Sequence, residues 1–164
     1  MARPGRNSMP EEIQNPRRTF FVTTKTSMGR RLLQSERNAG LMIDVLRSLV
    51  QEDAFELHDF VVMPDHLHLL LTVDAGMTVE KAMLLVKGRF SYRLGKELGH
   101  LGEVWQRGFS EVQVMDRESF EKHCEYIAQN PVKSRLVASS DEFPFCFRFL
   151  AKKRAEAKRN KVIA

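Results

Sequence analysis

The chain has 164 residues, which is enough for one domain with a hydrophobic core and short for two. Its hydrophobic fraction of 43% predicts a folded protein, and no apolar run is long enough to span a bilayer. Lysine and arginine number 26 against 21 aspartate and glutamate residues, a basic balance that by itself does not identify a partner.

The basic residues are concentrated at the two ends of the chain. Residues 1–18 form a basic N-terminal segment, residues 19–150 the expected domain, and residues 151–164 a basic C-terminal tail. Such ends attract polyanions, although two solvated ends without a partner fit the charge pattern equally well. The N-terminal segment has no apolar stretch after its basic residues, so we expect no secretory signal and a cytoplasmic protein. Cys124 and Cys146 form no CxxC pair and are expected to be free thiols.

The first half of the domain predicts a strand, a helix and a hairpin. Residues 19–25 are rich in β-branched and aromatic side chains, as in a strand. Ser35 is placed to cap a helix that runs to about Gln51, with apolar residues at helical spacing. Residues 56–63 and 66–73 are apolar runs separated by only two residues, which indicates an antiparallel hairpin.

The second half predicts a helix, a short strand and a third helix. Thr78 is placed to cap a helix that reaches about residue 98, where a glycine-containing loop follows. Residues 111–115 are expected to form the strand. Asp116 is placed to cap the third helix, which is expected to end near Asn130 because Pro131 disfavours helical backbone in the residue before it.

The order of these elements predicts an α+β fold. The first six match a ferredoxin-like βαββαβ antiparallel sheet with two helices on one face. The third helix is left over, and it can dock on the opposite sheet face or on a partner subunit.

One predicted strand carries a pair of histidines. Because side chains alternate across a strand, His66 and His68 share one face of the segment 66–73, and its other face is entirely leucine and valine. At this spacing two imidazoles can converge on one metal ion. Two histidines on a solvent-facing sheet surface, without metal, are the alternative.

The third helix places a tyrosine away from its apolar stripe. Tyr126 and Asn130 are four residues apart and therefore lie on one helix face. The apolar stripe of Phe120, Cys124 and Ile127 is centred elsewhere, so core packing does not explain Tyr126. The Asn130 amide oxygen is a possible third metal ligand, with Tyr126 a nucleophile beside it. A boundary aromatic and a helix C-terminal asparagine are the alternative interpretations.

Four segments carry a resemblance to a known family. FFVTTK, VVMPDHLHLLL, WQRGF and YIAQNPVKSRLV, in this order and spacing, resemble the HUH single-tyrosine transposases, and within them the REP-associated tyrosine transposases. The resemblance spans residues 18–137. It implies that His66, His68 and Asn130 bind Mg²⁺ or Mn²⁺. It also implies that Tyr126 attacks single-stranded DNA and forms a 5′-phosphotyrosine link.

The resemblance further implies a substrate, single-stranded DNA beside a hairpin such as a REP-like palindrome. The sequence departs from the family where Phe109-Ser110-Glu111 replaces an aromatic-Asp pair. The segment before it, which includes Arg107, is therefore expected either to contact DNA or to brace the third helix. The candidate DNA contacts are all basic: Arg89, Arg93, Lys96, Arg107, Lys122, Lys152, Lys153 and Arg154.

Several alternatives remain open at the level of sequence. Insertion-sequence relatives act as dimers with the tyrosine helix supplied in trans, whereas the basic tail favours the REP-associated type, so both a monomer and a homodimer are considered. A domesticated protein that binds hairpin DNA without cutting it is the competing function. An unrelated metallohydrolase using the two histidines is a third, but it leaves Tyr126 without a role.

Overall fold

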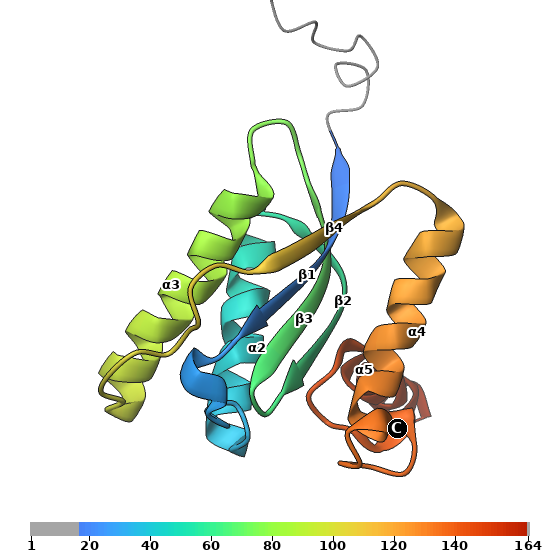
Figure 1. Cartoon of the computed structure of the whole chain (residues 1–164). Coiled ribbons are helices and arrows are strands. Elements are labelled where there is room, and N and C mark those ends of the chain that lie inside the picture. The colour runs from blue at the N-terminus through green and yellow to red at the C-terminus, as the bar shows by residue number, and fades with distance from the viewer. Residues whose placement is uncertain (1–16, 164) are drawn as a thin grey trace, which may run out of the picture.

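The computed structural model describes residues 17–163, in which a four-stranded antiparallel sheet carries helices on both faces (Figure 1). The strand order is β2-β3-β1-β4, the ferredoxin-like order, so the predicted α+β fold is confirmed. In chain order the elements are β1 (Arg18–Lys25), the 3₁₀ turn η1 (Ser27–Gly29), α2 (Glu36–Gln51), β2 (Glu56–Met63), β3 (His66–Val73), α3 (Val79–Leu98), β4 (Ser110–Val114), α4 (Arg117–Lys133), η2 (Ser140–Glu142) and α5 (Phe147–Ile163).

Helices α2 and α3 cover one face of the sheet and enclose the main core (Figure 1). The predicted apolar face of β3, formed by alternate residues from Leu67 to Val73, is fully buried there. The predicted caps are present, since the side chains of Ser35 and Thr78 accept hydrogen bonds from backbone N–H groups in the first turns of α2 and α3. Gly99 ends α3 in the left-handed conformation at φ 69°, which glycine adopts without a Cβ penalty.

Helix α4 lies on the opposite face of the sheet, one of the two positions that the sequence left open (Figure 1). Its predicted apolar stripe, including Phe120 and Ile127, packs with Val61, Met63 and Leu70 of β2 and β3 in a second core cluster. Asp116 caps this helix by accepting a hydrogen bond from the Ser119 N–H, as predicted.

The predicted end of α4 near Asn130 is wrong, because the helix continues through Pro131 to Lys133. A capping arrangement beyond the proline determines the end. Arg135 adopts the left-handed conformation at φ 57°, and the N–H groups of Arg135 and Leu136 donate to the carbonyl oxygens of Val132 and Pro131. Asn130 therefore stays in regular helix one turn after Tyr126.

The chain after α4 covers the free edge of β2. The Val62 N–H donates to the Phe145 carbonyl oxygen at 2.9 Å, and Val61 forms an isolated bridge with Cys146. Such covering removes an unpaired strand edge. Helix α5 starts immediately afterwards, and the basic tail is its exposed continuation, described as helix up to residue 163. No helix within residues 17–163 is long and apolar enough to cross a membrane.

Beside the second core lies a partly buried carboxyl group, that of Asp59, which makes folding sensitive to pH. Burial raises the pKa of Asp59 to about 6, although the Phe60 N–H and the Cys124 thiol donate hydrogen bonds to it. Because the folded pKa lies above the unfolded value, the folded state binds the proton more tightly. The resulting stabilisation is present below about pH 4 and is lost as pH rises through about 6.

Asp59→Asn should therefore raise the melting temperature at pH 7.5, where the wild-type carboxylate is ionised and partly buried. At ~2–4 °C per kcal/mol for a chain of this length, we expect a gain of several degrees. At pH 4 the two proteins should melt at nearly the same temperature. Thermal denaturation followed by circular dichroism measures both, and a gain of equal size at the two pH values would contradict the role of ionisation.

Candidate active site

The two histidines of β3 point toward α4, on the face of the sheet opposite the main core. The antiparallel register places His68 directly across from Thr23 of β1, and His66 across from Lys25. The two imidazole rings approach each other edge to face, with centroids 4.7 Å apart. The sheet thus brings the rings together in the way the strand periodicity predicts.

Each histidine is held through its Nδ1 atom. His66 Nδ1 lies 2.7 Å from the Asp65 carboxylate, and His68 Nδ1 lies 2.8 Å from the Thr23 hydroxyl. A carboxylate can only accept, so His66 Nδ1 donates its proton, and in the neutral ring Nε2 carries a lone pair. This arrangement, in which a carboxylate orients a histidine for its other nitrogen to bind, is common around protein metal sites.

His68 is the more buried of the pair, with 4% of its surface exposed. Burial, aided by His66 and Lys25, lowers the pKa of His68 to about 3, so the ring is neutral at physiological pH. Its Nε2 atom is buried and has no hydrogen-bond partner within residues 17–163. A buried polar atom without a partner is costly, which makes this nitrogen available to a ligand.

Helix α4 adds an amide oxygen and a phenol to the two imidazoles. Asn130 is 8% exposed, and its Oδ1 atom lies 3.3 Å from His66 Nε2. Tyr126 is 42% exposed, and its ring lies edge to face with His68 at 5.4 Å between centroids. All four side chains predicted from the sequence thus gather in one place within a single chain, and Tyr126 is the most accessible of them.

The nitrogen and oxygen atoms that face one another form a suitable donor set for a divalent cation. Ligands that bind one octahedral cation at ~2.1 Å lie about 3 Å apart, close to the distance between His66 Nε2 and Asn130 Oδ1. No three His, Cys, Asp or Glu side chains converge within residues 17–163, at this site or elsewhere. The candidate donor set therefore consists of two imidazoles and the Asn130 amide oxygen.

Three residues of the site were not found by the sequence analysis. Thr23 has no local signal, because cross-strand pairing brings it to His68. Lys133 lies seven residues after Tyr126 on α4, so the helical repeat could have indicated its place over the Tyr126 ring, 5.5 Å from the centroid. Phe21 links the site, since its ring contacts His68 at 5.3 Å and Tyr126 at 5.7 Å between centroids. A fourth residue, Asp65, was treated only as one of the two residues between the predicted strands, with no role beside His66.

Three of the predicted DNA contacts are on α3, which lies on the other side of the sheet from α4, the helix that carries Tyr126 (Figure 1). Arg89 forms two hydrogen bonds, at 2.7 and 3.0 Å, to the carboxylate of Glu52, the residue that follows α2. Arg93 is shared between an acid on α2 and another on α3, and Lys96 donates to the Tyr92 hydroxyl. The structure does not bring these residues to the site, and their contact with DNA stays a prediction.

The remaining predicted contacts are nearer to the site or project from the body. Lys122 is ion-paired with Glu118 at 3.0 Å on the part of α4 that precedes Tyr126. Arg107 is exposed in the loop before β4. The tail residues Lys152, Lys153 and Arg154 are exposed on α5. Their DNA contacts also remain predictions.

Trp105 does not brace the third predicted helix, α4, which was one of the two roles considered for the segment before Phe109. Its indole N–H donates to the Lys87 carbonyl oxygen of α3 at 3.0 Å, and its ring packs on Phe90. Trp105 also bridges to Thr26 just after β1. The indole therefore attaches the loop to α3 and β1, on the main-core side of the sheet.

The fold and the site together define an α+β protein that sets a His-x-His strand against a tyrosine-bearing helix. The sequence pattern of the family described as "Transposase IS200 like" matches residues 21–130, which include all four site residues. The chain therefore belongs to the IS200-like transposase family.

Individual relatives agree with this assignment. The REP-associated tyrosine transposase of Escherichia coli (strain K12) is 26% identical over 128 residues, which cover 77% of this chain and 74% of that protein. A Haemophilus influenzae (strain ATCC 51907 / DSM 11121 / KW20 / Rd) relative, which carries the same name provisionally, is 30% identical over 103 residues. These residues cover 56% of this chain and 57% of that protein. A solved REP-associated tyrosine transposase bound to a REP hairpin shares the fold, with a TM-score of 0.71, 23% identity, and coverage of 84% of this chain and 81% of that one.

Proposed function

We propose that this transposase cleaves and rejoins single-stranded DNA beside a hairpin, with Tyr126 as the nucleophile and a divalent cation held by His66, His68 and Asn130. The observation that carries the proposal is the convergence of four side chains from β3 and α4 on one site. The hairpin substrate is suggested by the REP hairpin bound to the similar solved protein.

The chemistry proposed for Tyr126 balances without an energy source. Its phenol oxygen attacks the scissile phosphorus, a phosphotyrosine bond to the 5′ end forms, and the bond to the 3′ oxygen breaks. The phenol proton ends on the released 3′ hydroxyl. Because the covalent link conserves the phosphodiester bond energy, the reverse attack by a 3′ hydroxyl rejoins strands without ATP.

The surrounding residues support this role. Exposure of Tyr126 leaves its hydroxyl accessible to a strand, and the contacts of its ring with Phe21 and His68 restrict its position. The Lys133 ammonium over the ring favours negative charge nearby. When bound, Mg²⁺ or Mn²⁺ supplies charge withdrawal from the scissile phosphate and orients it for in-line attack.

A denaturing gel tests the proposal directly. The protein is incubated with end-labelled single-stranded hairpin DNA and Mg²⁺ or Mn²⁺, and a covalent protein-DNA adduct should appear together with a shortened free strand. DNA that is bound tightly but never cut, whichever hairpin is tried, would favour the non-cleaving binding protein instead.

The basic tail is expected to contribute affinity but no chemistry. Deleting residues 152–164 removes the exposed end of α5 and leaves its packed first turn, so the body should fold. Hairpin affinity should fall, and the slope of log affinity against log salt should flatten by ~0.7 for each phosphate that the tail no longer neutralises.

A full-length variant with the six tail cations changed to glutamine separates charge from helix length. The changed residues are Lys152, Lys153, Arg154, Lys158, Arg159 and Lys161. Fluorescence anisotropy at several salt concentrations measures both variants. Unchanged affinity and an unchanged salt slope would show that the tail does not contact DNA.

A further inference from the structure

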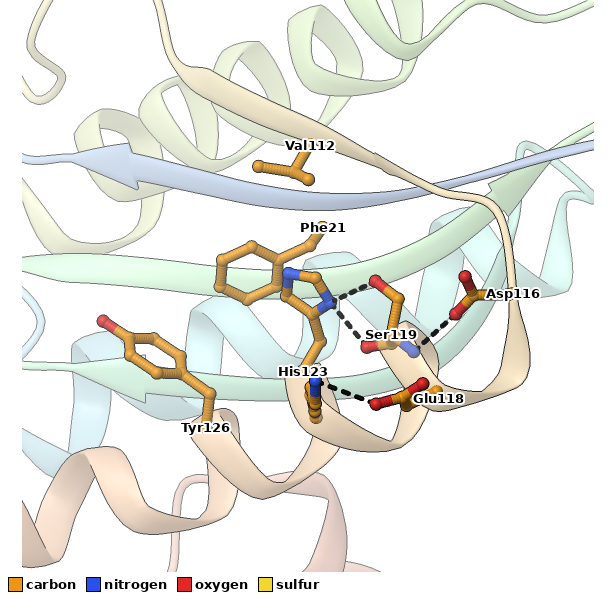
Figure 2. A pocket seen from close by; sticks show the side chains of 8 residues that line it. Phe21, Val112, Asp116, Glu118, Ser119, His123 and Tyr126 are labelled. Carbon is orange, nitrogen blue, oxygen red and sulfur yellow. Dashed lines mark hydrogen bonds and ion pairs between the residues drawn. The ribbon is translucent and has the colours of Figure 1, made fainter.

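An open cavity of about 510 Å³ lies beside Tyr126, between the sheet and the first half of α4 (Figure 2). Its lining comes from three elements: Phe21 of β1, Val112 of β4, and His123 and Tyr126 of α4. The rings of Phe21 and His123 lie 4.6 Å apart between centroids, and Phe21 meets Tyr126 edge to face. In the proposed reaction Tyr126 attacks and Phe21 restricts its ring, so Val112 and His123 have no role there.

His123 presents a hydrogen-bond acceptor in this aromatic cavity. Its Nδ1 atom lies 2.7 Å from the Ser119 carbonyl oxygen, which can only accept, so Nδ1 carries the proton (Figure 2). In the neutral ring Nε2 then has a lone pair. No hydrogen bond to this Nε2 is formed within residues 17–163.

The acidic residues at the mouth of the cavity are already engaged. Asp116 accepts the Ser119 N–H at 2.7 Å as the helix cap, and Glu118 is paired with Lys122 at 3.0 Å (Figure 2). Their charges stabilise the first turns of α4 and are offset by the lysine. The unused surface of the cavity therefore consists of rings, one valine and one acceptor nitrogen.

We propose that this cavity binds one unpaired nucleobase of the DNA strand, at the nucleotide next to the scissile phosphate. Aromatic side chains that stack on bases are the main sequence-tolerant contacts in single-strand binding. An N–H group on the base edge would donate to His123 Nε2. The base would anchor the strand so that the adjoining phosphate lies at Tyr126. The inference rests on the proposed function, because it takes single-stranded DNA beside a hairpin as the ligand.

The test fills the cavity without disturbing the reacting groups. Val112 is 52% exposed on β4, so Val112→Phe adds bulk at the cavity wall with little risk to folding. Gln113→Phe is the matched control, because the next residue of the strand points to the other face and pairs with Phe20. His123→Phe keeps an aromatic ring in place and removes the acceptor nitrogen, together with the Nδ1 hydrogen bond to the Ser119 carbonyl oxygen.

All variants are made in a Tyr126→Phe background, which keeps the ring but cannot cut. Hairpin DNA carries an abasic site at each position of the flanking single strand in turn, and dissociation constants are compared with intact DNA. One position should show a loss of about tenfold, the scale of one stacked base. That loss should shrink to less than about twofold with Val112→Phe, persist with Gln113→Phe, and be intermediate with His123→Phe.

Failure of this inference is distinguishable from failure of the proposed chemistry. Because binding is measured, the abasic effect is visible even if wild-type protein never forms an adduct, and the pocket then stands without the cleavage reaction. The wild-type protein could cleave DNA while Val112→Phe reduces the abasic loss of affinity at no position. That result would refute the proposed pocket and leave the role of Tyr126 as nucleophile in place. If Gln113→Phe also abolishes the abasic loss of affinity, added bulk on β4 acts indirectly. That result would also refute the proposed pocket.

Discussion

Tyr126→Phe is expected to lose adduct formation and strand cleavage, by about 10³-fold or more, while hairpin affinity stays within about twofold of wild type. The substitution removes only the attacking oxygen. The ring contacts with Phe21 and His68 survive it, so the site should keep its shape. The measurements are a denaturing gel with end-labelled DNA and a binding assay on the same preparations.

The chain offers a matched control for this substitution. Tyr92 is the only other tyrosine; it is 65% exposed and lies on α3 across the sheet. Tyr92→Phe should cleave like wild type. An adduct that persists in Tyr126→Phe and disappears in Tyr92→Phe would show that the nucleophile lies on α3 and not on α4, and would refute the proposal.

His66→Ala and His68→Ala are expected to abolish cleavage, as is EDTA with the wild-type protein. Each histidine is proposed to supply an Nε2 lone pair to the cation. Each alanine variant keeps only one imidazole and the Asn130 amide oxygen, too few donors to hold a divalent cation. His66→Ala is the cleaner variant because the buried His68 also packs against Phe21. Calorimetric titration with Mn²⁺ should show binding in wild type and none in the two variants.

Two further substitutions make the metal test more specific. Asp65→Asn removes the carboxylate that orients His66, and it should weaken Mn²⁺ affinity by roughly 10–100-fold without eliminating binding. His100→Ala changes a histidine in the loop after α3 and should bind metal normally. Undiminished cleavage of DNA in excess EDTA would refute the metal-assisted mechanism, whatever the alanine variants do.

The sequence by itself determined most of the secondary structure and the fold class. Apolar alternation in 66–73 is strong because one strand face is buried, and it placed β3 and both histidines correctly. Capping residues likewise marked the starts of α2, α3 and α4, since unpaired N–H groups of a first turn need a local acceptor. These signals act over a few residues, so the chain reveals them without tertiary context.

Only the tertiary structure decided what surrounds the site. The end of α4 depends on a left-handed Arg135 and on burial of Pro131, neither of which the proline itself indicates. Thr23 reaches His68 through strand register across 45 positions of sequence. Arg89 was predicted as a phosphate contact by charge, and the packing of α3 against α2 also pairs it with the Glu52 carboxylate, a contact that the sequence did not indicate. Long-range packing selects such partners, and sequence spacing carries no record of it.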